Sequence, residues 1–183
     1  MSFVLTKQPL VKEIFKDNYV RKIWEGGTFG YKASFRNNWH RGVDYGADVG
    51  EPLYALEDGV VTVAFEKGST TLEKDFGIYV AIYYPKWDVT ISYAHMSRLE
   101  VKANVPVTKG MRVGLVGNTG KSQGPHLDVM IASGRRIKLQ TVYDNGLDFE
   151  KWTPAVKQDG NVHLKKSAKN YATGQIIPEQ YKD

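Results

Sequence analysis

Two histidine and aspartate pairs in this 183-residue chain have the spacing of metal ligands. His40 is followed four residues later by Asp44, and His126 is followed two residues later by Asp128. Residues two or four apart in an extended strand point to the same face, so each pair can converge on one point. Because the chain has no cysteine, any metal must be bound by His, Asp or Glu. A catalytic zinc needs three such ligands and one open position for water.

Each pair alone also fits an ordinary surface pattern. His40 and Asp44 could be a surface histidine near a turn aspartate, and polar alternation on the solvent face of a sheet would give His126 and Asp128. His95 ends the run "VTISYAH", which predicts it on one strand face with Val89, Ile91 and Tyr93, either as a core residue or as a proton carrier at a site.

The combination of these groups, their order and the glycine-rich approach to the last pair favour a site. Two same-face pairs and His95 supply five groups, enough for a metal-dependent hydrolase. The fourth histidine, His163, lies outside every motif and is expected at the surface.

Three motifs resemble those of the lysostaphin/LytM-type zinc metalloendopeptidases, which cut peptide bonds in bacterial peptidoglycan. They are "HRGVD", "YAHM" and "GNTGKSQGPHLD", and the similarity runs from about residue 38 to residue 132. The resemblance implies that His40 and Asp44 are zinc ligands and that His95 and His126 are catalytic. The third ligand position, a histidine in the family, is Asp128 here.

An aspartate at this position changes the charge of the implied centre more than its geometry. Aspartate binds zinc at about 2.0–2.2 Å, but one neutral histidine and two carboxylates cancel the charge of a divalent ion. We expect a weaker Lewis acid, whose bound water has a pKa above about 7. Activity would then be lower or shifted to higher pH, and Mn²⁺ or Ca²⁺ could replace Zn²⁺.

Short β-type runs separated by glycines and turns fill residues 40 to 140. They predict a mainly β fold, an antiparallel sheet or small barrel-like fold with a groove and little helix. The predicted strands are "GVVTVAF", "GIYVAIYY", "VTISYAHM", "MRVGLVG", "HLDVMIA" and "RRIKL". The polar stretch 66–76 is long for a hairpin loop and is expected to wall the groove.

The expected organisation is an N-terminal extension at 1–30, a LytM-like domain at 31–145 and a C-terminal extension at 146–183. Apolar residues four apart in the first segment predict a short helix, although a strand also fits. These pairs are Leu10 and Ile14, Val11 and Phe15, and Tyr19 and Ile23.

The net charge of +5 is spread along the chain, which fits a solubility surface or attraction to anionic cell-wall polymers. No nucleic-acid motif occurs, and no apolar run reaches the roughly 20 residues of a membrane span. The N-terminus lacks the pattern of a secretory signal. We therefore expect action at the bacterial cell wall with delivery as a phage lysin or virion tail component, or as a fragment of a longer secreted protein.

Two functions follow from these expectations. The first is a zinc-dependent endopeptidase that cuts cross-bridge or stem peptides of peptidoglycan. The second is a catalytically impaired or inactive family member that binds the cell wall or regulates another hydrolase. A third interpretation is an unrelated β-sandwich domain that binds a ligand. The sequence does not indicate an oligomeric state.

Overall fold

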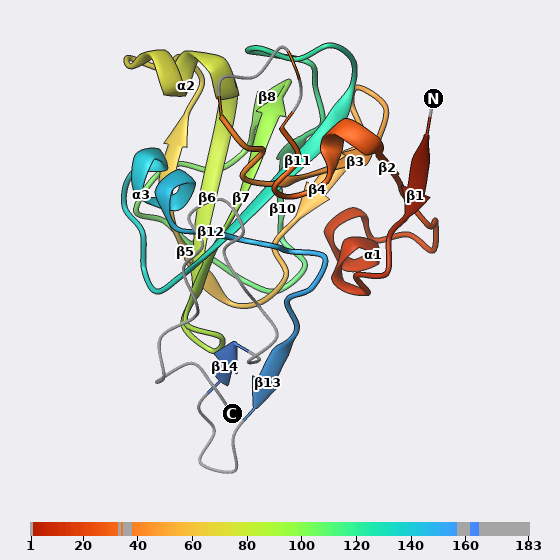
Figure 1. The fold of residues 1–183 in the computed structure, drawn as a ribbon. Helices are drawn as coiled ribbons and strands as arrows, with labels where there is room; N and C mark the ends of the chain where they lie inside the picture. Colours follow the sequence, from red (N-terminus) through yellow and green to blue (C-terminus); the bar gives the residue numbers. More distant parts are fainter. Residues whose placement is uncertain (1, 33, 35–37, 157–161, 165–183) are drawn as a thin grey trace.

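A large antiparallel sheet forms the body of the molecule in the computed structural model, which describes residues 2–32, 34, 38–156 and 162–164 (Figure 1). β12 (Gly146–Leu147) pairs with β11 beside the main path. In spatial order the other strands are β1 (Phe3–Leu5), β2 (Lys22–Trp24), β3 (Val43–Gly46), β11 (His126–Ser133), β7 (Val89–Met96), β6 (Ile78–Tyr84), β5 (Gly59–Phe65) and β9 (Pro106–Val107).

Two smaller sheets and a few short helices complete the described fold. One sheet contains β4 (Pro52–Tyr54), β10 (Arg112–Leu115) and β8 (Arg98–Leu99), and the other pairs β13 (Pro154–Val156) with β14 (Val162–Leu164). The helices are α1 (Leu10–Phe15), α2 (Thr71–Phe76), α3 (Leu139–Asp144) and the 3₁₀ turn η1 (Glu25–Gly27).

The prediction of a mainly antiparallel β fold with little helix is confirmed. The large sheet runs from β1 at one edge to β9 at the other, so it is open and not a closed barrel. Among the described residues, no helix is long and apolar enough to cross a membrane.

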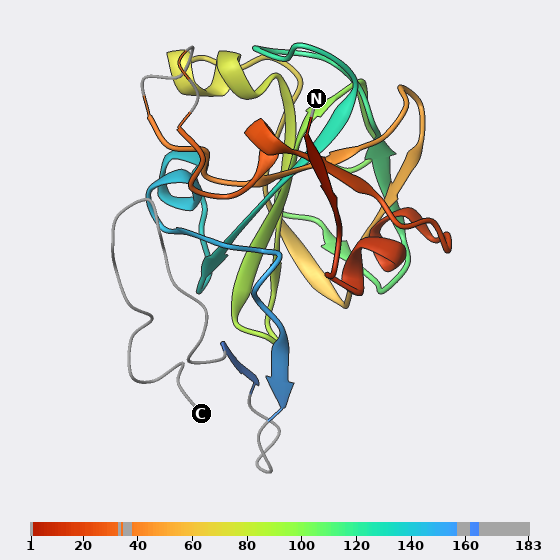
Figure 2. The same ribbon diagram turned by 45° about the vertical axis from the view of Figure 1, so that its right-hand side comes forward.

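Side-chain alternation along β11 divides the core into two clusters. Leu127, Val129 and Ile131 pack into the larger cluster, whereas Met130 and Ala132 pack into a smaller one with residues of α3. Helices α2 and α3 lie on one side of the large sheet and α1 lies on the other (Figures 1 and 2). Residue 128 therefore shares the face that α3 covers lower down the same strand.

The N-terminal segment confirms part of the helix prediction. The predicted pairs Leu10 and Ile14, and Val11 and Phe15, lie in α1 with their side chains buried. Lys16, directly after the helix, has the left-handed conformation (φ 51°). The third predicted pair is not helical, because Tyr19 is exposed and Ile23 lies in β2. Strands β1 and β2 from this segment extend the large sheet next to β3.

Five of the six predicted central strands are present as β5, β6, β7, β10 and β11. The sixth, "RRIKL" at 135–139, is wrong. Ile137 is 64% exposed and Leu139 begins α3, so the apolar residues of this run do not share a buried strand face. The stretch 66–76 contains α2, which starts with a capping box formed by Thr70 and Glu73.

Candidate metal centre

Two neighbouring strands bring the predicted ligands together at one end of the large sheet. Asp128 on β11 lies directly opposite Asp44 on β3, and His40 enters from the segment before β3, where its N–H bonds the Tyr31 carbonyl. One ligand atom from each of His40, Asp44 and Asp128 lies within 4.8 Å of the other two, and all three residues are buried. His40 Nε2 is 3.1 Å from Asp44 Oδ1 and 3.4 Å from Asp128 Oδ2.

The surroundings of Asp128 suit a cation. A Cβ atom at Gly42 would lie only 2.1 Å from Asp128 Oδ1, so the glycine leaves room for this carboxylate. Asp128 Oδ1 is buried and has no hydrogen-bond partner among the described residues. An unsatisfied buried acceptor is destabilising unless an ion or water binds it. The His/Asp/Asp set therefore fits a divalent metal.

Backbone carbonyls fix the orientation of His40, His95 and His126. Nδ1 of His40 lies 3.2 Å from the Thr28 carbonyl, Nδ1 of His95 lies 2.8 Å from the Thr119 carbonyl, and Nδ1 of His126 lies 2.7 Å from that of Gly124. A carbonyl only accepts hydrogen bonds, so each Nδ1 carries the hydrogen and donates it. The Nε2 atom of each ring is therefore free to face the carboxylates of Asp44 and Asp128.

Both predicted catalytic histidines lie beside the three predicted ligands. His126 Nε2 is 3.5 Å from Asp44 Oδ1, and His95 Nε2 is 3.8 Å from Asp128 Oδ2. The His95 and His126 ring centroids are 4.9 Å apart. All five groups named from the sequence are therefore assembled in one cluster. The side chain of His163 lies outside the described residues.

The carboxylates and burial act in opposite directions on the histidines. Burial lowers the pKa of His40, but the charges of Asp44 and Asp128 outweigh it and raise the pKa to about 10. A bound metal would take the place of that proton. Burial lowers the pKa of His95, against the attraction of Asp128. The lowered pKa favours the neutral form of His95, whose Nε2 can accept a proton.

A break in strand alternation turns His95 toward the ligands. The pairing of β6 with β7 shifts register between Ile78 and Val80, and His95 itself has a φ of 56°. The prediction that His95 shares the face of Tyr93 is wrong, because this bulge lets His95 approach Asp128. Non-glycine residues with positive φ are strained, and such residues concentrate at functional sites.

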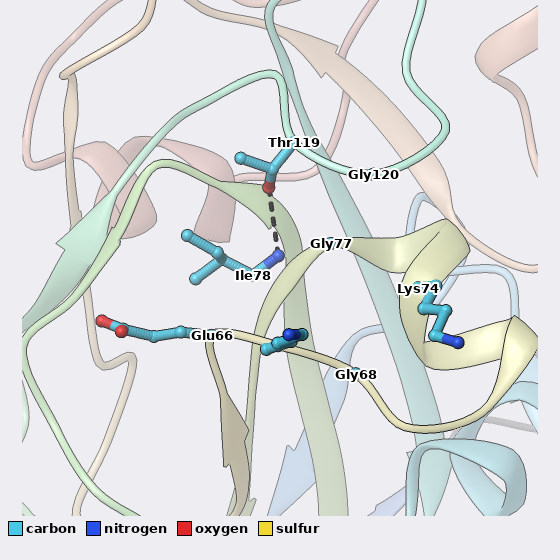
Figure 3. A pocket seen from close by; sticks show the side chains of 8 residues that line it. Glu66, Gly68, Lys74, Gly77, Ile78, Thr119 and Gly120 are labelled. Atoms are coloured by element: carbon cyan, nitrogen blue, oxygen red, sulfur yellow. Dashed lines mark hydrogen bonds between the residues drawn. The ribbon is translucent and has the colours of Figure 1, made fainter.

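Two residues that the sequence did not predict as part of the site hold His95 in place. Phe76 stacks on the His95 ring, with centroids 5.9 Å apart and planes at 8°. Thr119 Oγ1 donates a hydrogen bond to the Met96 carbonyl at 2.6 Å. The same oxygen accepts the Ile78 N–H at 3.0 Å (Figure 3). Thr119 lies within a motif already recognised, but nothing in its side-chain type reveals that its carbonyl binds His95.

Thr119 also lines a pocket of about 410 Å³ (Figure 3). Glu66, Lys67 and Lys74, from the stretch predicted to form a wall, line it together with Gly120. A groove over the metal cluster itself stays a prediction.

Residues 38–139, more than half of the chain, match the profile of Peptidase family M23. The chain therefore belongs to Peptidase family M23, and the predicted resemblance to lysostaphin/LytM-type peptidases is confirmed.

Individual relatives agree with this assignment. The chain is 37% identical over 99 residues to the peptidoglycan DD-endopeptidase ShyA of Vibrio cholerae, which covers 54% of this chain and 21% of ShyA. The matched segment thus spans about a fifth of that relative. A zinc-containing peptidase from V. cholerae is 25% identical, with a TM-score of 0.56 over 72% of this chain and 36% of that one.

The catalytic domain of lysostaphin from Staphylococcus simulans shares the fold. Its TM-score is 0.55 at 23% identity, covering 67% of this chain and 84% of that domain.

Proposed function

We propose that this protein is a zinc-dependent endopeptidase that hydrolyses peptide bonds in bacterial peptidoglycan. The observation that carries the proposal is the buried His40, Asp44 and Asp128 group with the Nε2 atoms of two further histidines beside it. The family supports hydrolysis, and the relative ShyA is named as a peptidoglycan DD-endopeptidase. The neighbouring zinc-containing peptidase supports zinc.

The chain's own residues suit the proton transfers of peptide hydrolysis. A bound zinc would acidify water and polarise the scissile carbonyl. His95 and His126 present Nε2 on the same side as the ligands, with Nδ1 held by a carbonyl. Nε2 of each ring is placed to take up a proton from an attacking water and then donate it to developing negative charge.

Action at the cell wall follows from this substrate class, and the net charge of +5 favours approach to anionic wall polymers. Delivery as a phage lysin or tail component stays a prediction.

Asp128 supports a second candidate. Two carboxylates and one neutral imidazole neutralise a divalent ion, which weakens its effect on bound water. The alternative function is a wall-binding or hydrolase-regulating member that holds a metal and cuts slowly or not at all. The same oxygen-rich ligands also suit Mn²⁺ or Ca²⁺.

Incubation with purified peptidoglycan separates the two candidates. We expect new peptide termini by mass spectrometry, loss of cleavage with a chelator, and recovery when zinc is added back. His95→Ala should keep the metal and lose cleavage, because His95 is not a ligand. A metal-loaded wild-type protein that binds peptidoglycan and releases no peptide supports the second candidate.

A further inference from the structure

Strand β1 forms one edge of the large sheet (Figure 1). In the described part of the chain, β2 is the only strand that pairs with it. The Thr6 hydroxyl, directly after β1, donates a hydrogen bond to the Glu150 carboxylate at 2.9 Å. Gln8 Nε2 donates to the carbonyls of Phe149 and Trp152. These contacts hold β1 in place, so its outer edge is a defined surface of the fold.

The backbone groups at this outer edge follow from the pairing of β1 with β2. The Ser2 carbonyl and the Thr6 N–H, which flank β1, both bond to residues that flank β2. Antiparallel strands alternate between hydrogen-bonded and non-hydrogen-bonded pairs, so Val4 bonds to β2 as well. The N–H and carbonyl groups of Phe3 and Leu5 therefore point away from β2. Two donors and two acceptors thus face the open edge.

The side chains along this edge are apolar and exposed. Phe3, Val4 and Leu5 are 45%, 53% and 54% exposed. Trp24, opposite Phe3 on β2, is also exposed and meets the Phe3 ring edge to face. Proteins usually protect an edge strand from pairing by a lysine, a proline or a β-bulge. Strand β1 has none of these three features, so it is suited to pair with another strand.

The sequence of β1 is complementary to itself when a second copy runs antiparallel to it. With the two-fold axis at Val4, Phe3 lies opposite Leu5 of the partner subunit. The outward N–H and carbonyl groups of these residues can then form a hydrogen-bonded pair on each side of the axis. Every opposed side chain is apolar, and residues 2–6 carry no charge, so the pairing brings no like charges into opposition. Lys22 on β2 is the nearest cation of this ladder, and its Nζ already lies 4.6 Å from the centroid of the Phe3 ring.

We infer that the protein forms a symmetric dimer in which β1 pairs with β1 of the partner subunit and joins the two large sheets into one. The second strand is a copy of β1, because this strand complements itself in side chains, in charge and in hydrogen-bonding groups. A two-fold pairing uses each open edge once, so association through β1 ends at two chains. The inference concerns the edge of the sheet and does not depend on the proposed function.

A single introduced cysteine tests both the pairing and its register, because the chain has no cysteine of its own. In this register the two Val4 residues form a non-hydrogen-bonded pair with Cα atoms about 4.5 Å apart, a separation at which disulfides form. Val4→Cys should therefore give a disulfide-linked dimer on mild oxidation, measured on a non-reducing gel. Val49→Cys is the matched control, because Val49 is 58% exposed in the turn after β3. Phe3→Cys should not cross-link either, because Phe3 lies opposite Leu5 of the partner subunit.

Sedimentation velocity over a range of concentrations measures the association without an introduced cysteine. Wild-type protein should pass from monomer to dimer as its concentration rises. Leu5→Lys places a charge on the open edge and removes two apolar cross-strand pairs from the dimer. The dissociation constant of the dimer should therefore rise by about tenfold or more. Ile137→Lys introduces the same charge at an exposed residue outside β1 and should match wild type.

Three results would overturn the inference. The first is wild-type protein that stays monomeric at every concentration up to its limit of solubility. The second is a dimer that persists unchanged in Leu5→Lys. The third is cross-linking of Val4→Cys that is no faster than cross-linking of Val49→Cys. If Leu5→Lys does not fold, the two cysteine variants decide, because each replaces one exposed valine with a residue of similar size.

Discussion

Asp128 is the residue on which the chemistry of the cluster depends. It lies opposite Asp44 and reaches both His40 and His95 with one carboxylate oxygen. Gly42 leaves space for the other oxygen. Asp128 thus lies where it could bind a metal ion together with His40 and Asp44. Its charge would then reduce the acidity that a divalent ion confers on water.

Replacing Asp128 with histidine should strengthen the hydrolase. The change removes one negative charge, so the bound water should ionise at lower pH and hydrolysis at pH 7 should rise by about tenfold or more. The acid limb of the pH–rate profile should move to lower pH. Kinetics on a soluble stem peptide between pH 5 and pH 10 measure both effects. A lower rate for Asp128→His at every pH would show that the aspartate is the better ligand here.

Thr119 should act on the rate through His95. Its carbonyl holds His95 Nδ1, and its hydroxyl joins Met96 to Ile78 at the bulge. Thr119→Val removes the hydroxyl, so His95 should lose its orientation and kcat should fall by about tenfold with KM unchanged. Thr119→Ser keeps the hydroxyl and should restore the wild-type kcat. A rise in KM alone, or no rescue by serine, would contradict this positioning role.

Among the elements, α2 and the segment 117–124 are held together by two glycines. Gly77 and Gly120 both have positive φ, and a Cβ on Gly120 would lie 2.4 Å from the Asp75 carbonyl and 2.5 Å from the Gly77 nitrogen. Lys121 N–H also bonds the Asp75 carbonyl at 2.7 Å. This contact fixes both Phe76 and Thr119, the two residues that position His95.

Gly120→Ala should separate these elements. Backbone strain and the close contacts should lower the free energy of unfolding by about 1–3 kcal/mol, measured by urea denaturation. Gly124→Ala is the matched control, because a Cβ there meets no atom within 4 Å and the residue does not have a positive φ. Equal stability of the two variants would show that the close contact of Gly120 with α2 does not contribute to stability.

The sequence predicted the elements where apolar alternation was long and uninterrupted. Strand β7 has the predicted bounds Val89–Met96, since nearly all its side chains meet a core. Helix α2 was missed, although Thr70 and Glu73 form a capping box with a recognisable spacing. The side of β7 on which His95 lies could not be predicted, because the bulge depends on pairing with β6 and on Thr119.

In the site, too, some residues could be predicted from the sequence and others could not. His40, Asp44 and Asp128 could be named as ligands because their side-chain types and spacing fit a metal site and because their motifs resemble those of a known family. The carbonyls of Thr28, Thr119 and Gly124 that orient the rings carry no such signal, because every residue has a carbonyl.

At the scale of the whole molecule, Glu150 ties the N-terminal segment to the large sheet. Its carboxylate accepts hydrogen bonds from the Thr6 hydroxyl, the backbone N–H groups of Lys7 and Gln8, and the Tyr45 hydroxyl. These contacts join residues more than 100 positions apart, so the residues before the family match belong to the same folded unit as β3.

Glu150→Gln should loosen this connection. The amide retains one acceptor oxygen and loses the charge, so the free energy of unfolding should fall by about 1–3 kcal/mol, the range for hydrogen bonds to a charged group. Limited proteolysis should then cut first between α1 and β2. Glu13→Gln is the control, because its contact with Lys109 is exposed and 3.8 Å long. Unchanged stability of Glu150→Gln would show that the hydrophobic contacts of α1 suffice.

The most direct test of the central claim, that Asp128 completes a metal centre with His40 and Asp44, is the zinc content of the protein. Wild-type protein and Asp128→Ala are soaked in zinc, dialysed without chelator and analysed by mass spectrometry of the elements. We predict about one zinc per wild-type chain and far less in Asp128→Ala, because two ligands hold zinc more weakly than three. Wild-type protein that retains far less than one zinc, or Asp128→Ala that retains as much as wild type, would contradict the assignment.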